Sequence, residues 1–292
     1  MTEFEKIVIG KSSIPALIIT IILMIVIPVV CFLYWRRKHK QQTNISYLIA
    51  GAAGFILSAR LLEVGVHYFC VAADNPVSRF INGNTWAFVL YGTTMAGIFE
   101  ECGRHIVFKY IMKKNRTPEN AVLYGIGHGG IEALSVALPL MATYLAIAVL
   151  FSSGSTENAL STLKITEENA EAVLPSVQAA AAFDYGTMAL NAIERLFAML
   201  LQIGLTVIVF DGAVNEKKAL LPLAILLHML TDTFPALYQR GVMPLWSVEV
   251  WAAFWAAVTG FIAAKLYRKM KERTIRQGGY PAEMGTNKNR IC

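Results

Sequence analysis

The sequence predicts an all-α, polytopic integral membrane protein with about seven transmembrane helices. Of its 292 residues, 55% are hydrophobic and only 16% are charged, and the mean hydropathy is +0.50. Soluble domains average about 25% charged and about 45–50% apolar residues, so this chain has fewer charged and more apolar residues than that class. Four cysteines without a CxxC pair also exclude a disulfide-rich secreted scaffold for a chain of this length.

Seven apolar segments are long enough to cross a bilayer, which takes about 20 residues of helix. We expect the long fourth and fifth segments to tilt, kink or extend beyond the bilayer. The predicted spans are residues 14–35, 47–71, 86–108, 119–151, 179–210, 219–237 and 249–267.

The lysine and arginine residues predict the orientation of these spans. Loops on one side carry 18 of them, loops on the other side carry five, and three lie within spans. Because basic loops stay in the cytoplasm, the N-terminus is expected outside and the C-terminus inside. The net charge of +6 then reflects topology. No basic patch is interleaved with aromatic residues, so no nucleic-acid partner is expected.

The sequence predicts one domain, with a long polar loop and a C-terminal tail. Residues 1–270 are predicted to form a single transmembrane domain. Its long polar loop, residues 152–178, lies on the outer side and has room for a short helix. Residues 271–292 are predicted to form a basic, disordered cytosolic tail.

Ionisable residues inside a bilayer are costly and mark candidate functional sites. Counted along the helices at about 1.5 Å per residue, two glutamates and two histidines from three spans lie roughly 13 Å from the cytoplasmic helix ends. A further carboxylate lies one turn deeper on each of two spans. The candidate residues are Glu100, Glu101, Arg104, His128, Glu132, His228 and Asp232.

Such a layer suits the activation of water in two ways. Two histidines and a carboxylate can hold Zn²⁺ and leave one position for a water molecule. His128 and His228 would then be metal ligands, conditional on a metal being present, and Glu101 would be the general base. Alternatively, a glutamate deprotonates water directly while the histidines stabilise an oxyanion. The sequence contains neither HExxH nor GxSxG.

These motifs resemble those of the CAAX-prenyl-protease and bacteriocin-processing superfamily of intramembrane proteases, and more closely its YhfC-like branch of membrane peptidases. The resemblance covers about spans two to seven. The spacing from the glutamate pair to the arginine is one residue shorter than in the wider family, as in the branch, and a tyrosine stands where phenylalanine is common. The matching motifs are Glu100-Glu101…Arg104, Tyr124…His128 and His228…Asp232.

The resemblance implies water-mediated cleavage of a membrane-associated or lipidated peptide in the bacterial inner membrane, at a site open to the cytosol. Glu100 or Glu101 would be the base and Arg104 an orienting group, with the two histidines as ligands or oxyanion donors. We expect Asp232 to orient His228. For Glu132, support of the site and simple packing are equally compatible with the sequence.

Two other function classes stay open. The same layer would serve a transporter or proton relay, although the sequence has no inverted repeat. A non-catalytic scaffold or immunity factor would instead bind a partner through residues 152–178. Two more polar groups within the spans are expected to form structural networks, with substrate gating as the alternative: Arg60, Glu63 and His67, and Glu194 with Arg195.

Overall fold

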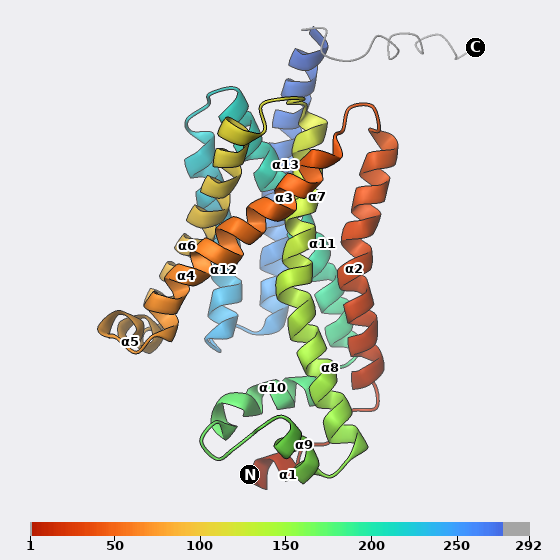
Figure 1. The fold of residues 1–292 in the computed structure, drawn as a ribbon, viewed down its shortest axis with the longest axis vertical. Coiled ribbons are helices and arrows are strands. Elements are labelled where there is room, and N and C mark those ends of the chain that lie inside the picture. The colour runs from red at the N-terminus through yellow and green to blue at the C-terminus, as the bar shows by residue number, and fades with distance from the viewer. Residues whose placement is uncertain (1, 277–292) are drawn as a thin grey trace, which may run out of the picture. The chain divides into compact units, whose positions relative to one another are not determined.

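The computed structural model describes residues 2–276, and every regular element among them is helical (Figure 1). This confirms the predicted all-α class. Up to residue 111 the elements are α1 (Thr2–Glu5), α2 (Ser13–Lys38), α3 (Ile45–Phe55), η1 (Ile56–Glu63), α4 (Val64–His67), η2 (Tyr68–Ala72), α5 (Pro76–Gly83), α6 (Thr85–Ile106) and η3 (Val107–Ile111).

The second part of the chain continues the helical pattern, and the η elements throughout are π-helical stretches. The elements are α7 (Pro118–Glu132), η4 (Ala133–Ala137), α8 (Leu138–Ser153), α9 (Thr156–Thr162), α10 (Ala170–Ala182), α11 (Tyr185–Val214), α12 (Leu220–Gln239) and α13 (Leu245–Arg276).

Six helical segments are long and apolar enough to cross a membrane, one fewer than predicted. The predicted span missing from this set is the third, residues 86–108, which is helical as expected and forms α6 and the start of η3. Its last turns carry Glu100, Glu101 and Arg104, and these residues reduce its apolar character. The six segments are Ser13–Lys38, Ile45–Ala72, Pro118–Ser153, Tyr185–Val214, Leu220–Gln239 and Leu245–Arg276.

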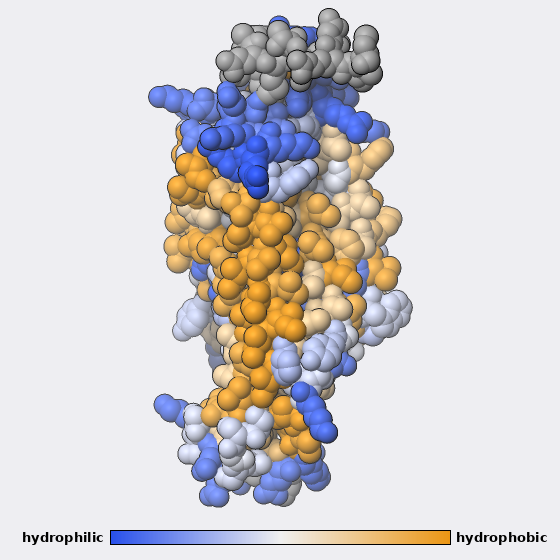
Figure 2. Space-filling model, turned by 90° about the vertical axis from the view of Figure 1, so that its right-hand side faces the viewer, coloured by the Kyte–Doolittle hydropathy of each residue, from blue (hydrophilic) through white to orange (hydrophobic). Residues whose placement is uncertain are grey.

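The side of α2 turned away from the protein suits contact with lipid. Figure 2 shows an apolar surface along this helix and hydrophilic groups at its carboxyl end. The sequence places Arg36, Arg37 and Lys38 there, at the end of the helix. Its exposed apolar residues include Ile18, Ile22, Ile25, Val29 and Leu33.

The chain forms two compact units. The first comprises Met1–Val29 and Glu132–Leu196, and the second comprises Val30–Ile131 and Phe197–Cys292, described as far as residue 276. In the first unit, the predicted polar loop holds two helices, α9 and α10. Buried apolar residues from the loop and from α1 and α8 form its core: Phe4, Ile147, Leu160, Ile165, Val177 and Ala180.

Two predicted boundaries differ from the structure. The fifth span was expected from residue 179, but α10 ends at Ala182 and α11 begins at Tyr185. Asp184 accounts for the new start, because its Oδ1 accepts a hydrogen bond from the Thr187 backbone N–H at 2.7 Å and so caps α11. At the other end, α13 continues to Arg276, so residues 271–276 of the predicted tail are helical. The rest of that tail lies outside the described residues.

In the second unit, α3 crosses α7 at very close range (Figure 1). A Cβ atom on Gly127 would overlap the backbone carbonyl of Leu48, and one on Gly51 would lie 3.0 Å from the backbone nitrogen of His128. Glycine is therefore required sterically at this crossing. The contact brings α3 against the segment of α7 that carries His128.

Candidate functional site in the second unit

The glutamate pair on α6 is bound by a buried arginine of the same helix. Arg104 Nη1 donates to Glu101 Oε1 at 2.6 Å, and Arg104 Nη2 donates to Glu100 Oε2 at 3.2 Å. Helical spacings of three and four residues put both carboxylates within reach of one guanidinium. Arg104 is only 1% exposed, so its charge depends on these partners for compensation.

His128 of α7 contacts the first glutamate and the arginine. Its Nε2 lies 2.9 Å from Glu100 Oε2 and 2.7 Å from Arg104 Nη2. The ring of Phe55 packs edge-on against the imidazole, with centroids 5.0 Å apart. His128 is fully buried, so the imidazole is held by both polar and aromatic neighbours.

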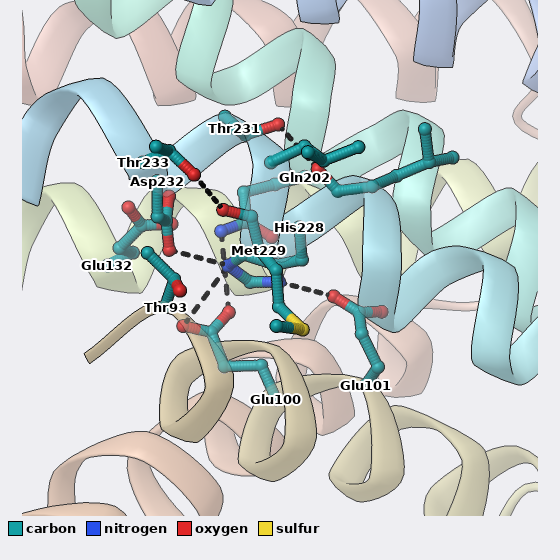
Figure 3. A network of polar contacts seen from close by, with 12 residues as sticks. Thr93, Glu100, Glu101, Glu132, Gln202, His228, Met229, Thr231, Asp232 and Thr233 are labelled. Atoms are coloured by element: carbon teal, nitrogen blue, oxygen red, sulfur yellow. Dashed lines mark hydrogen bonds and ion pairs between the residues drawn. The ribbon is translucent and has the colours of Figure 1, made fainter. Parts of the chain in front are cut away.

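His228 of α12 contacts the second glutamate instead (Figure 3). Its Nδ1 lies 2.6 Å from Glu101 Oε1. Its other nitrogen, Nε2, lies 3.4 Å from Asp232 Oδ2 and 4.0 Å from Glu100 Oε1. The structure therefore brings all six predicted catalytic residues into one network: Glu100, Glu101, Arg104, His128, His228 and Asp232.

Exposure increases across this network from one side to the other. The side chains of Glu101 and Arg104 are 0% exposed, and that of Glu100 is 9% exposed. The Asp232 side chain, at 35%, is the most exposed member. Asp232 therefore marks the accessible side of the network, and His228 Nε2 lies next to it.

Gln202 of α11 belongs to the network but was not predicted. Its Oε1 accepts a hydrogen bond from Arg104 Nη2, and its Nε2 donates to Glu100 Oε2 at 3.4 Å. The predicted site consists of ionisable groups within the spans, and an uncharged amide carries no such signal. The one available signal was a polar side chain in the otherwise apolar stretch from Leu196 to Leu205.

The comparisons with known proteins identify the family. Residues 23–252 match the family described as YhfC intramembrane metalloprotease. The chain belongs to this family. It is 30% identical over 243 residues to a protein from Bacillus subtilis (strain 168) described as "Uncharacterized membrane protein YhfC", covering 83% of this chain and 92% of that relative. No solved structure matches the chain.

The YhfC family match confirms the resemblance drawn from the sequence motifs, and it includes every residue of the network. It also supports an integral membrane location, in agreement with the apolar helices. The description of the family as a metalloprotease implies a bound metal ion.

The network as arranged does not fit a bound cation. Among residues 2–276, no group of three or more His, Cys, Asp or Glu side chains has a geometry that could hold a metal ion. The Arg104 guanidinium also lies against His128 Nε2, one of the predicted ligand atoms. A second cation at that atom would meet the charge of Arg104 directly.

The remaining candidates form separate groups. Glu132 lies in the first unit, where its Oε1 is 3.9 Å from Arg195 Nη1, and Arg195 also pairs with Glu194. In the second unit, His67 Nε2 lies 3.2 Å from Glu63 Oε1, and His67 Nδ1 lies 2.8 Å from the Tyr91 hydroxyl.

Arg60 does not share the stripe that an α-helix would give it with Glu63 and His67. The segment is π-helical over Ile56–Glu63, which changes the angular spacing of its side chains, and Arg60 is exposed. The predicted polar group on this span is therefore made by Glu63 and His67 with Tyr91.

Proposed function

We propose that this chain is an intramembrane peptidase in which Glu100 activates the attacking water. The observation that carries the proposal is the difference between the two glutamates. Glu101 is fully buried, and its Oε1 is held by both Arg104 and His228. Glu100 has Oε2 bound in the network, whereas its Oε1 lies towards the accessible side near His228 and Asp232.

In the proposed reaction, Glu100 Oε1 takes a proton from a water molecule. The resulting hydroxide attacks the carbonyl carbon of the scissile peptide and forms a tetrahedral oxyanion. Glu100 then delivers the proton to the leaving nitrogen, the carbon–nitrogen bond breaks, and the carboxylate is regenerated. A positioned general base of this kind typically contributes about 10²–10⁴-fold to the rate.

The other residues of the network position Glu100 and stabilise the charge that forms in the reaction. His228 donates from Nδ1 to Glu101, and Nε2–H of the imidazolium form would stabilise the oxyanion on the accessible side. Asp232 orients His228, while Arg104 and His128 hold Glu100 Oε2. None of these steps is routed through a metal, because the donor arrangement does not fit one.

The proposed substrate is a membrane-associated or lipidated peptide whose scissile bond reaches the site from the cytosolic side. Basic loops support this orientation, since 18 of the lysines and arginines lie on the predicted cytoplasmic side. The bacterial relative supports a plasma-membrane location. Buried polar residues within membrane-spanning helices are expected near pathways for substrate or water.

Comparison of newly formed N-termini in membranes tests this function. Cells would express wild-type protein, Glu100→Gln or a control, His105→Gln, at equal membrane levels. His105 lies one residue beyond Arg104 on α6 but outside the network. We expect a set of new N-termini with wild type and the control, and their loss with Glu100→Gln. Identical N-termini in all three cultures would contradict the proposal.

A proton relay is the second candidate. The observation in its favour is a continuous series of titratable groups, from fully buried His128 through Glu100 and His228 to partly exposed Asp232. Proton flux into liposomes carrying the protein, abolished by His128→Ala, would favour this function. Equal flux with wild type and variant would exclude it.

A further inference from the structure

Gln202 connects a fourth helix to the glutamate–arginine group. It lies on α11 within the second unit and is only 6% exposed. Its side-chain carbonyl accepts from Arg104 Nη2, and its amide nitrogen donates to Glu100 Oε2 at 3.4 Å. One neutral side chain thus contacts both charged groups.

The contacts to Glu100 are unequal between its two oxygens. Oε2 lies within 3.4 Å of three nitrogen atoms, which belong to His128, Arg104 and Gln202. Oε1 lies 4.0 Å from His228 Nε2. Holding one oxygen from three helices fixes the direction in which the other oxygen points.

Glutamine suits this position chemically. A primary amide both accepts and donates, so it can bind the guanidinium of Arg104 and the carboxylate of Glu100 together. Methionine has similar length but offers neither group. A shorter amide, asparagine, keeps the chemistry but cannot reach both partners from the same backbone position.

The packing of α11 against α7 places Gln202 at this point. A Cβ atom on Gly129 would lie 3.1 Å from the Cβ of Gln202, which is tighter than ordinary contact. Because Gly129 has no side chain, α11 can approach α7 closely at the turn next to His128. Thr206, one turn further along α11, is also buried but bonds only to the carbonyl of Gln202 in its own helix.

We propose that Gln202 is a positioning residue that holds Glu100 with Oε1 directed towards the substrate. This inference rests on the proposed function of Glu100 and adds a residue outside the three sequence motifs. A side chain acting in this way changes the rate of the chemical step. It does not contribute to substrate binding, because its amide faces Arg104 and the bound oxygen of Glu100.

The test is a kinetic comparison of Gln202→Met with the matched control Thr206→Val. Purified proteins in detergent would cleave a mixture of internally quenched peptides with degenerate central positions. For Gln202→Met we expect kcat to fall by about 10²-fold, the scale of a misplaced catalytic group, while KM stays within about twofold. Thr206→Val should retain wild-type kcat and KM.

Gln202→Asn serves as the second variant if Gln202→Met does not fold, with the same expected separation of kcat from KM. A folded variant whose kcat stays within about twofold of wild type would overturn the inference. Failure of both variants to fold while Thr206→Val folds would also overturn it, because Gln202 would then be a structural residue. Glu100→Gln in the same assay separates the two claims. If Glu100→Gln cleaves normally, the proposed function is wrong. If Glu100→Gln is inactive and Gln202→Met is active, only the proposed role of Gln202 is wrong.

Discussion

Glu100 and Glu101 are adjacent on α6, yet their carboxylates contact histidines of different helices. Glu100 Oε2 lies 2.9 Å from His128 Nε2, and Glu101 Oε1 lies 2.6 Å from His228 Nδ1. Arg104 contacts both carboxylates. Successive helical residues point about 100° apart, so one dipeptide can join α6 to α7 and to α12. This division gives the two glutamates different proposed roles.

Removal of Arg104 should destabilise the protein strongly. Arg104→Met leaves two buried carboxylates without their shared cation, and breaking a buried charge network typically costs about 3–5 kcal/mol. We expect a clear fall in unfolding temperature in detergent. Arg79→Met is the control, because the Arg79 side chain is 68% exposed and its loss should change little. Equal unfolding temperatures for the two variants would contradict the importance of the buried network.

The crossing of α3 and α7 should tolerate no side chain at Gly127. Gly127→Ala forces its Cβ against the Leu48 carbonyl, and overpacking of this kind costs about 1–3 kcal/mol. Gly65→Ala is the matched substitution, because no atom lies within 4 Å of a Cβ added there. Gly127→Ala should therefore lower the unfolding temperature, and Gly65→Ala should leave it unchanged. A stable Gly127→Ala protein would show that the helices do not cross as described.

The stability of the structure around the carboxyl end of α2 should depend on pH through His39, which follows that helix. Partial burial lowers the pKa of His39 below 6.5, and nearby Lys271 adds to this effect while Glu119 opposes it. The folded state therefore favours neutral imidazole. As the pH falls below about 6.5, the unfolded chain takes up a proton first, and stability decreases.

His39→Gln removes this proton uptake. Unfolding temperatures measured from pH 8 to pH 5.5 should fall less steeply for His39→Gln than for wild type. Parallel curves would mean that the imidazole is equally basic in the folded and unfolded states.

The predicted orientation is testable with fusions to the C-terminus. A cytoplasmic C-terminus predicts fluorescence from a fused green fluorescent protein and no activity from a fused alkaline phosphatase. The opposite pair of results would reverse the topology. It would also move the proposed site to the outer side of the membrane.

The fold and much of the network could be predicted from the sequence because both depend on simple spacings. Apolar length predicts the membrane helices, and depth counted from the predicted cytoplasmic ends places Glu100, His128 and His228 at one level. The different contacts of Glu100 and Glu101 could not be predicted, because they depend on which neighbouring helix each carboxylate meets. Gln202 was missed because a neutral amide costs less to bury than an ion and so stands out less.

The π-helical stretches also escaped prediction. Their formation depends on how one turn widens under tertiary packing, and this leaves no periodic signal in the sequence. As a result, Arg60 was assigned to the same stripe as Glu63 and His67, whereas it is exposed. The start of α11 at Tyr185, later than the predicted residue 179, was missed for a related reason, because the apolar residues of α10 run almost up to the cap at Asp184.

The most direct test of the central claim is cleavage of the quenched peptide mixture by chelator-treated, metal-free protein, with zinc content measured on the same sample. The account predicts that metal-free wild type cleaves at its original rate and that metal-free Glu100→Gln does not. The account would be contradicted if chelation abolished cleavage by the wild type and zinc restored it. In that case the wild type would also hold near-stoichiometric zinc, and the His128→Ala/His228→Ala double variant would hold none. That result would make the two histidines metal ligands.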